Sequence, residues 1–459
     1  MTVVDVLKRS PAPRDAIAVV DGTVRLTYEQ LEHRVDDRVS ELCSGNGSAS
    51  SHPFRAGDPL AGQVVPFPVE ADAAGVVELL AVWRSGSIPA PLNVRLAVAE
   101  KEAVRQRLAT PAVPAGTQVV LWTSGTSGRP RGVALSFENL EHSTRAVAER
   151  LSLTADDTWL ATLSPAHVGG LALVVRSLLL GGTLLCAGAF DASRMWDLLE
   201  GNGSSVSLVP THVSLVPTQL LRLLDHRPES DAPRALRCVL VGGAYAPASL
   251  VERALGRGWP LALTYGATEA TSQVATSAPD LTRRKPGTVG PPLSGVELRL
   301  TAGGEIVVRG PTRALGYVGS DREALDDGSG WYHTGDLGRL DDDGHLWITG
   351  RRIDRIVTGG VTVDAVEVEE ALRAHPTVLD ACVVGIPDDE WGERIAVWIE
   401  PVEGEFDVES VSADLRERLS GSKLPRVWHA AGGLPRNANG KVDRAKVRET
   451  LEAFRRESG

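Results

Sequence analysis

Apolar strand patterns alternate with helical patterns along most of the chain, and this alternation restricts the fold more than any other feature. Residues 63–67 predict a strand, residues 71–85 a helix and residues 88–90 a second strand. The same order returns as a helix at 139–150, a strand at 158–162, a helix at 171–180 and a strand at 183–186. Strands that alternate with helices pair in parallel and are covered by those helices. The sequence therefore predicts an α/β fold class, with a large N-terminal domain of mostly parallel sheets and helices.

The pattern changes after Gly287, where short alternating strands predict a small β subdomain. The glycine-flanked segment GRRIDRIVTGG at 350–360 then precedes an α+β pattern. Its elements are a helix at 365–374, strands at 379–384 and 395–399, and a helix at 408–419. We predict an N-terminal domain of residues 1–351 and a smaller, mobile C-terminal domain of residues 352–459. The second has about 105 residues, which is enough to fold alone.

Bulk properties exclude several classes of protein. The 459 residues include 48 basic and 59 acidic side chains, and the net charge of -11 argues against nucleic acid as the main partner. The four cysteines form no C-x-x-C pair, so a reducing, cytoplasmic location is expected. Residues 1–14 lack the apolar core of a signal peptide. Residues 168–190 approach membrane-spanning length but carry Arg176, so they predict a buried helix followed by a strand, without membrane insertion.

A run of small hydroxyl and glycine residues follows a short apolar strand in the stretch LWTSGTSGRPRGVAL at 121–135. Glycine lets the main chain approach an anion closely, so backbone N–H groups and hydroxyls of this run could cradle a phosphate. It is not the common P-loop, because it lacks the lysine of GxxxxGK[ST]. A glycine-rich surface turn is the alternative interpretation, and the run alone does not decide between them.

Four further motifs follow that run in a fixed order. They are YGATE at 265–269, TGD at 334–336, GRRIDRIVTGG at 350–360 and LPRNANGKVDR at 434–444. Together with TSGTSGRPRG they resemble the adenylate-forming acyl-CoA synthetase superfamily over essentially the whole chain. The resemblance implies an ATP-dependent acid-thiol ligase, which forms an acyl-adenylate and then an acyl-CoA thioester from ATP, a carboxylic acid and coenzyme A.

The resemblance also implies roles for individual residues. Ser124 to Gly128 would hold the β- and γ-phosphates of ATP, and Tyr265 would stack on adenine. Asp336 would accept the ribose hydroxyls, and Glu269 would hold Mg²⁺, a cation that prefers carboxylate and phosphate oxygens. The implied ATP-binding residues are Thr123, Ser124, Gly125, Thr126, Ser127, Gly128, Gly242, Gly243, Tyr265, Gly266, Thr268, Asp336, Arg351 and Lys441.

Lys441 is the residue to which the resemblance assigns the adenylation step, together with Thr268 and Glu269. A flexible ammonium group can neutralise the charge that develops at the α-phosphate, and the chain has only six lysines. The family's mechanism implies that the C-terminal domain swings, presenting Lys441 for adenylation and the loop at 359–360 for the thiol step. Two departures stand out: Arg131 replaces the usual lysine after the phosphate loop, and Ile353 replaces an acidic hinge residue.

The acid substrate is indicated by other segments. Relatives that activate amino acids carry an F-D-x-S motif before the helix at 171–180, whereas this chain has Ala166 to Gly169 there, and its FDAS at 190–193 is out of register. The stretches AHVGGLALVVRSLLLGG, THVSLVPTQLLRLL and YGATEATSQVAT resemble the o-succinylbenzoate-CoA ligases of menaquinone biosynthesis. Predicted substrate-binding residues are His167, Arg176, Ser214, Gln219, Ser272 and Gln273.

Arg176 is the predicted partner of the substrate carboxylate that is not activated, and the alternative is an arginine that extends to solvent. Another small aromatic or fatty acyl-CoA ligase is the second candidate function. A nucleotide-binding protein without catalysis is disfavoured by Glu269 and Lys441. The expected partners are small molecules rather than nucleic acid or membrane, and the sequence leaves a homodimer open.

Overall fold

The computed structural model describes residues 5–44, 62–96, 98–108, 113–123, 131–202, 208–319, 325, 328–402, 406–437 and 440–458. The chain forms two compact units. Unit 1 consists of Met1–Gly243, Ala254–Arg299 and Val307–His333. Unit 2 consists of Ala244–Arg253, Leu300–Ile306 and Thr334–Gly459. This confirms the predicted fold class, in which a large α/β part is followed by a smaller α+β part.

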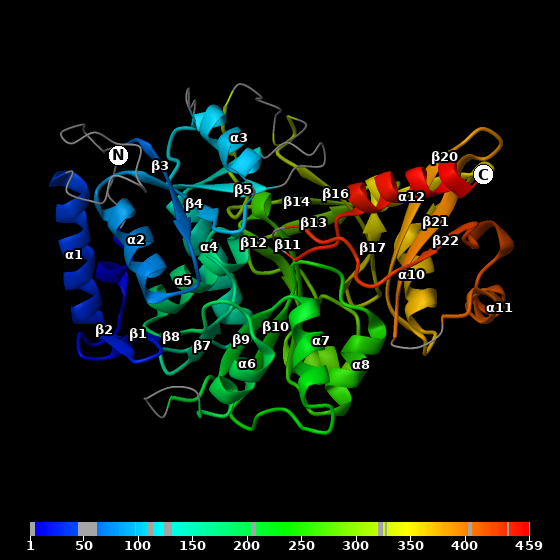
Figure 1. The fold of residues 1–459 in the computed structure, drawn as a ribbon. Coiled ribbons are helices and arrows are strands. Elements are labelled where there is room, and N and C mark those ends of the chain that lie inside the picture. Colours follow the sequence, from blue (N-terminus) through cyan, green and yellow to red (C-terminus); the bar gives the residue numbers. More distant parts are fainter. Residues whose placement is uncertain are drawn as a thin grey trace. The chain divides into compact units, whose positions relative to one another are not determined.

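An eight-stranded sheet with the order β12-β11-β10-β9-β7-β8-β1-β2 forms the core of unit 1 (Figure 1). The six inner strands pair in parallel, and the two edge strands β2 and β12 pair antiparallel. Its strands are β1 (Ile17–Asp21), β2 (Val24–Thr27), β7 (Thr158–Ala161), β8 (Thr183–Cys186), β9 (His212–Leu215), β10 (Cys238–Val241), β11 (Leu261–Ala267) and β12 (Ser272–Thr276). Strands β7, β9 and β10 are buried throughout, and β8 is buried after its first residue, because helices cover them, as parallel sheets require.

The helices that belong wholly to unit 1 follow the strands in the predicted alternation. They are α1 (Tyr28–Ser44), α2 (Ala73–Arg84), α3 (Val98–Leu108), α4 (Phe137–Leu151), α5 (Val168–Leu180), α6 (Ala192–Leu199), α7 (Pro217–His226) and α9 (Pro279–Arg284). The predicted buried helix and strand at 168–190 are confirmed as α5 and β8. In the part of the chain that is described, no helix is long and apolar enough to cross a membrane.

Two small sheets complete unit 1. The parallel pair β3 (Val64–Val69) and β4 (Ile88–Asn93) forms one of them. The other has the order β15-β6-β5 and is antiparallel, with β5 (Val119–Thr123), β6 (Arg131–Leu135) and β15 (Gly316–Tyr317). Strands β5 and β6 pair up to Thr123 and Arg131, so they flank the hydroxyl- and glycine-rich run at both ends.

A four-stranded sheet, β13-β14-β16-β17, contains points where the chain passes from one unit to the other. Its strands are β13 (Glu297–Leu300), β14 (Glu305–Arg309), β16 (Tyr332–Leu340) and β17 (Leu346–Arg351). Helix α8 (Ala248–Gly256) also spans a division point.

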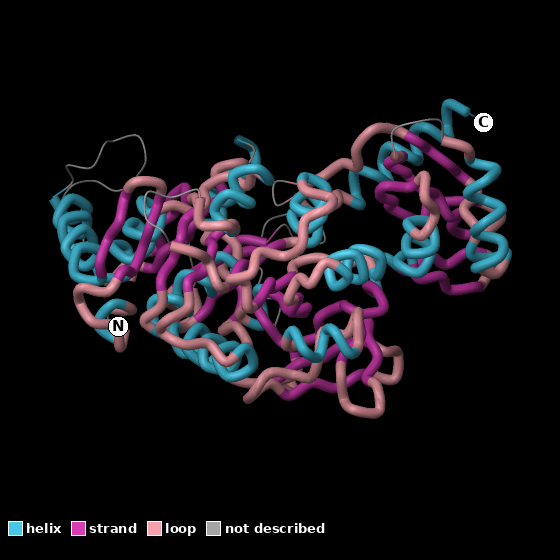
Figure 2. The backbone as a smooth tube through the Cα atoms, turned by 90° about the horizontal axis from the view of Figure 1, so that it is seen from below, coloured by secondary structure: helices cyan, strands magenta, loops and turns pink. Residues whose placement is uncertain are grey.

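Unit 2 is built on a five-stranded sheet in which β19 (Val361–Asp364), β18 (Arg355–Thr358), β21 (Gly392–Pro401) and β20 (Val378–Asp388) follow in that order and β22 (Val427–Ala430) pairs with β21. Its helices are α10 (Ala365–Arg373), α11 (Val408–Arg418) and α12 (Arg444–Ser458), and Figure 2 shows strands and helices as separate colours. Alternate residues of β20 enter two apolar clusters: Val383 packs with α10 and α11, and Val384 packs with α12. Helices therefore cover both faces of this sheet.

The hexapeptide VSLVPT occurs twice, at 206–211 and 213–218, and the two copies differ in structure where they are described. In the second copy, Val213 to Leu215 lie in β9 and Pro217 begins α7. In the first copy, Pro210 and Thr211 form a loop that leads into β9, and its first residues lie outside the described part of the chain. Proline suits the first turn of a helix, because it lacks only an N–H that would have no partner there. The surrounding chain, and not the hexapeptide, therefore decides where the helix begins.

Candidate active site

The carboxyl ends of β10 and β11 lie side by side, and each ends in a motif singled out from the sequence. Gly242 and Gly243 follow β10, and a Cβ atom on Gly242 would lie 2.5 Å from the Thr264 methyl group. Gly243 has φ of +80°, which favours glycine. The predicted Gly242-Gly243 turn and the YGATE segment are therefore neighbours at the edge of the sheet where α/β proteins bind ligands.

Gly266 is required by the close approach of β11 and β12. A Cβ atom on Gly266 would lie 1.5 Å from the carbonyl oxygen of Ser272, and the register between the two strands shifts at this point. The chain then turns through Thr271 and Ser272, whose φ angles are +51° and +84°. Positive φ is costly in residues with a side chain, and the surroundings hold it in place. Ser143 Oγ donates to the Thr271 carbonyl at 2.8 Å, and Thr271 Oγ1 donates to the Thr312 carbonyl at 2.6 Å.

Glu269 lies in the single 3₁₀ turn Thr268–Ala270 that this geometry creates. Tyr317 Oη donates to Glu269 Oε1 at 3.1 Å, and none of the described residues bonds the other carboxylate oxygen. Burial and the nearby Glu269 carboxylate raise the pKa of Tyr317, so the phenol is protonated and acts as a donor. The Arg131 guanidinium lies 5.3 Å from the Tyr317 ring centroid. Arg131 therefore contacts a side chain that orients Glu269.

Tyr317 was not identified from the sequence, and its removal should weaken the site. We expect Tyr317→Phe to lower kcat/KM for magnesium-ATP in adenylation about 10-fold, the size of one hydrogen bond to a charged group. The reason is that Glu269 loses the donor that fixes its carboxylate. Steady-state pyrophosphate release over a range of Mg²⁺ concentrations measures the effect, with the thermal midpoint as a check on folding. An unchanged Mg²⁺ dependence would contradict this role.

The predicted phosphate loop is described only at its first residue. Thr123 ends β5, and its Oγ1 donates to the Arg131 carbonyl at 3.4 Å. The remaining members, Ser124, Gly125, Thr126, Ser127 and Gly128, lie outside the described residues. Their assignment stays a prediction.

His167 and Ser214 lie on segments that reach the carboxyl edge of the large sheet. His167 immediately precedes α5, and its Nε2 lies 3.0 Å from Asn93 Nδ2 at the end of β4. Asn93 was not predicted, although a polar residue that ends a buried strand is a recognisable signal. Ser214 is buried in β9, and its carbonyl accepts a 2.7 Å hydrogen bond from Thr162 Oγ1.

The two predicted glutamines are already engaged within the fold. Gln219 Oε1 accepts from the Val216 backbone N–H at 3.0 Å and so caps the start of α7. Gln273 is buried, and its Oε1 accepts from Thr276 Oγ1 at 2.6 Å. Ser272 adjoins Gln273 and is half-buried. Both glutamine side chains therefore stabilise the fold through these hydrogen bonds. Of Gln219, Ser272 and Gln273, Ser272 is the residue best able to bind a substrate.

Arg176 is not brought together with the other predicted substrate-binding residues. It lies nine residues after His167, about 13 Å further along α5 at 1.5 Å per residue. Its guanidinium packs 4.6 Å from the Trp159 ring centroid. Trp159 and its sheet neighbours His212 and Cys238 lie near the amino ends of β7, β9 and β10, away from the edge where the glycine turns lie.

The burial of Arg176 corrects both interpretations made from the sequence. The residue is 2% exposed, so it does not extend to solvent. Its Nε has no hydrogen-bond partner among the described residues, and burial lowers the pKa of this guanidinium to about 10. A charge enclosed at the amino ends of the strands cannot pair with an acid at their carboxyl ends. The position therefore argues against the predicted role of Arg176 in substrate binding.

His212 in the same cluster makes the stability of unit 1 dependent on pH. Burial lowers the pKa of His212 to about 4, against the opposing effect of Asp157, whose Oδ1 lies 3.5 Å from Nδ1. Between pH 6.5 and 4 the unfolded chain therefore binds more protons than the folded chain. We expect the free energy of unfolding to fall as the pH falls through this window, by up to about 1.4 kcal/mol per pH unit.

Urea unfolding at pH 7, 6 and 5 measures this slope. The variant His212→Phe keeps a ring beside Trp159, whose centroid lies 4.8 Å away, and removes the titrating group. We expect its slope to be shallower than that of the original chain. Equal slopes for both proteins would show that other groups cause the acid sensitivity.

Unit 2 contains the remaining predicted ATP-binding residues. Asp336 in β16 pairs directly with Arg351 in β17, and Arg351 Nε donates to Asp336 Oδ1 at 2.5 Å. Asp336 is 7% exposed, whereas the side chain of Arg351 is half exposed. Lys441 is exposed on the loop before α12. The structure therefore brings Asp336 and Arg351 together within this unit.

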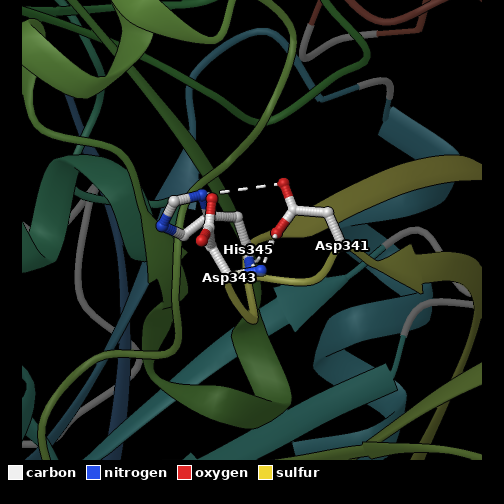
Figure 3. Close-up of side chains that lie close together, drawn as sticks. All are labelled: Asp341, Asp343 and His345. Atoms are coloured by element: carbon white, nitrogen blue, oxygen red, sulfur yellow. Dashed lines mark hydrogen bonds and ion pairs between the residues drawn. The ribbon is translucent and has the colours of Figure 1, made fainter.

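The hairpin between β16 and β17 also gathers Asp341, Asp343 and His345, whose ligand atoms lie within 4.8 Å of one another (Figure 3). The carboxylate of Asp341 organises the turn. Its Oδ1 accepts from the backbone N–H groups of Asp343 and His345 at 3.1 and 2.9 Å, and its Oδ2 accepts from Trp347 Nε1 at 3.1 Å. These bonds account for the position of Asp341 in the hairpin turn.

Comparison with known proteins places this chain among enzymes that bind AMP. The model of the AMP-binding enzyme family matches residues 97–318, and that of the AMP-binding enzyme C-terminal domain matches residues 367–441. The 2-succinylbenzoate--CoA ligase of Bacillus cereus strain AH820 is 36% identical over 345 residues, which cover 72% of this chain and 70% of the relative. The chain belongs to the AMP-binding enzyme family. The resemblance to adenylate-forming ligases is thereby confirmed.

Solved structures of other AMP-binding enzymes agree with this assignment. The o-succinylbenzoate CoA synthetase of Bacillus subtilis in complex with the acyl-adenylate intermediate OSB-AMP is 26% identical, with a TM-score of 0.82. The match covers 96% of this chain and 97% of that chain. The same B. subtilis enzyme in complex with ATP and magnesium ion also has a TM-score of 0.82 at 26% identity, over 97% of this chain and 98% of that chain. The boundary between residues 351 and 352 stays a prediction of the sequence.

Proposed function

We propose that this AMP-binding enzyme joins 2-succinylbenzoate to coenzyme A. The observation that carries the proposal is the similarity to 2-succinylbenzoate--CoA ligases, joined to a likeness over nearly the whole chain to a synthetase solved with its acyl-adenylate. The first step forms an acyl-adenylate, when a carboxylate oxygen of the acid attacks the α-phosphate of ATP and pyrophosphate leaves. In the second step the thiol of coenzyme A attacks the acyl carbonyl, and AMP leaves.

Within unit 1, the residues at the ends of β10 and β11 suit a nucleotide. Gly242 and Gly266 let the strands pack closely at this edge of the sheet, and Tyr265 supplies an aromatic face. We assign Thr268 to the α-phosphate region. Asp336 in unit 2 is assigned to the ribose hydroxyls, with Arg351 as its neighbour.

The donor set at Glu269 fits Mg²⁺, which binds one or two carboxylates and otherwise phosphate oxygens. One oxygen of Glu269 is fixed by Tyr317, and the other is available for a cation. When bound, the ion supplies positive charge beside the phosphates of ATP. Glu269 is therefore the residue assigned to hold it, and Thr268 precedes it in the same turn.

The acid is assigned to the region of His167, Ser214 and Ser272. An imidazole, a hydroxyl and the apolar carboxyl ends of the strands are the mixture of groups that small-molecule sites usually combine. His167 is held by Asn93, which gives the ring a defined orientation. We also propose a cytoplasmic location, because the four cysteines are free thiols.

A panel of acids tests the proposal. Pyrophosphate release is measured with 2-succinylbenzoate, benzoate, a medium-chain fatty acid and an amino acid, each with and without coenzyme A. We expect the highest kcat/KM with 2-succinylbenzoate, and a thioester product only when coenzyme A is present. Preference for benzoate or the fatty acid would favour another small aromatic or fatty acyl-CoA ligase. No pyrophosphate release with any acid would overturn the assignment as a ligase of these substrates.

A further inference from the structure

The loop that carries Lys441 is closed by its own backbone. Arg436 and Val442 form an antiparallel bridge across its base. The Asn437 N–H donates to the Lys441 carbonyl at 2.8 Å, and the Lys441 N–H donates to Asn437 Oδ1 at 3.1 Å. Because Lys441 is exposed, the position of its Cα atom depends on how firmly this loop is held.

Arginines at both ends of the loop tie it to α10 and β20 through a chain of ion pairs. At the first end, Arg436 Nη2 lies 2.9 Å from Asp380 Oδ2, and Arg436 Nη1 also donates to the Gly440 carbonyl at 3.2 Å. At the other end, Arg444 Nη2 lies 2.6 Å from Glu369 Oε1, and Arg444 Nη1 donates to the Val383 carbonyl at 2.7 Å.

Arg373 joins these two ends. Its Nε lies 2.8 Å from Asp380 Oδ1, and its Nη2 lies 3.4 Å from Glu369 Oε2. The chain therefore runs without a break from Arg436 through Asp380, Arg373 and Glu369 to Arg444. We call these five residues the Lys441 clamp.

Burying the charged side chains of the clamp costs desolvation free energy on folding. The side chains of Glu369 and Arg373 are 4% and 14% exposed, so charged groups lose most of their water. Buried ion pairs often contribute no more stability than apolar residues of the same volume, but they fix geometry. Charged groups that alternate in sign and bracket an exposed lysine are thus better explained by positioning than by stability.

Arg444 also links the clamp to the predicted hinge. Its Nε lies 3.3 Å from Asp354 Oδ2, in the 3₁₀ turn Arg352–Asp354. Asp354 follows Ile353, the position at which the resemblance places an acidic hinge residue. The clamp therefore connects the lysine loop with the segment about which the C-terminal domain is expected to swing.

We propose that the Lys441 clamp positions Lys441 for adenylation, with Arg436 and Asp380 as its positioning residues. The inference rests on the proposed function, because it gives the clamp a role only where Lys441 acts. The clamp residues act through the loop, and their loss displaces the ammonium group without removing it. Misplacement by about 1 Å costs about 100-fold in rate, so even a small shift of the loop is measurable.

The test compares the two half-reactions in the full chain. We expect Arg436→Ala to lower the single-turnover rate of acyl-adenylate formation about 10- to 100-fold. Thioester formation from a supplied acyl-adenylate should change less than twofold, and Arg436→Lys should recover part of the adenylation rate. The matched control is Arg418→Ala, which removes an exposed arginine paired with Asp414 inside α11. The control should leave both rates unchanged.

Combinations of variants separate positioning from a loss of folding. In a Lys441→Ala background, Arg436→Ala should cause no further loss of adenylation, because there is no ammonium group left to place. Asp380→Asn combined with Arg436→Ala should be no slower than the slower single variant. An equal fall of both half-reactions, or an additional loss in the Lys441→Ala background, would overturn the proposal. If Lys441→Ala itself adenylated normally, the role assigned to Lys441 would fail before the clamp was tested.

Discussion

Replacing Lys441 by alanine is expected to lower the single-turnover rate of acyl-adenylate formation by about 10³-fold or more. The ammonium group is the cation assigned to the charge that develops at the α-phosphate, and removing one such interaction from a transition state costs about 10²- to 10³-fold on its own. The exposed side chain does not support the core, so the variant should fold normally. Thioester formation from a supplied acyl-adenylate should proceed at nearly the original rate.

The measurement is single-turnover formation of adenylate from ATP and 2-succinylbenzoate, followed by thioester formation from the synthetic adenylate. Lys446→Ala is the matched control, because Lys446 is also exposed and pairs with Glu449 three residues along the same helix. It should leave both rates unchanged. Comparable adenylation by the Lys441 variant would refute the assignment.

Glu269→Gln should produce the second large effect, a fall in adenylation of about 10²- to 10³-fold at a fixed Mg²⁺ concentration. The amide keeps the shape of the carboxylate but removes the negative charge assigned to Mg²⁺. Tyr317 can still donate to the remaining carbonyl oxygen, so the local fold should persist. Adenylation measured against Mg²⁺ concentration should show a higher half-saturating concentration as well as a lower maximum.

Glu200→Gln is the corresponding control, since Glu200 is a surface residue that pairs with Arg227 in the same unit. Its Mg²⁺ dependence should match that of the original chain. A Glu269→Gln variant with the same Mg²⁺ dependence as the control would show that the ion is held elsewhere.

The alternation of strands and helices predicted the α/β architecture, because apolar periodicity records which faces are buried. Gly242, Gly266 and Asp336 were predicted from the motifs as ATP-binding residues, and that role stays a prediction. The structure adds that Gly242 and Gly266 lie where strands approach closely and that Asp336 pairs with Arg351. The steric reason why glycine is needed at positions 242 and 266 is visible only in the folded structure. Gly266, for example, is required by the carbonyl of Ser272 on the next strand.

Partners that are distant in the chain could not be predicted. Tyr317 lies 48 residues from Glu269, and Arg436 lies 56 residues from Asp380. Each pair forms because two elements that are distant in the sequence pack together, and local sequence patterns do not predict such a contact. The predicted substrate-binding role of Arg176 has a related weakness. Helical periodicity identifies the buried face of α5, but it does not show which end of the sheet a residue on that face reaches, because that depends on the direction of the helix.

The two consecutive non-glycine residues with positive φ, Thr271 and Ser272, affect both the stability of the fold and the position of Glu269. A glycine at either position would relieve the backbone cost, which is about 1 to 3 kcal/mol per strained residue. The same change would loosen the turn that follows Glu269, whose orientation depends on the hydrogen bonds that pin Thr271. A glycine at this turn is therefore expected to favour folding and to hold Glu269 less firmly. Stabilising substitutions should be sought elsewhere in the sheet.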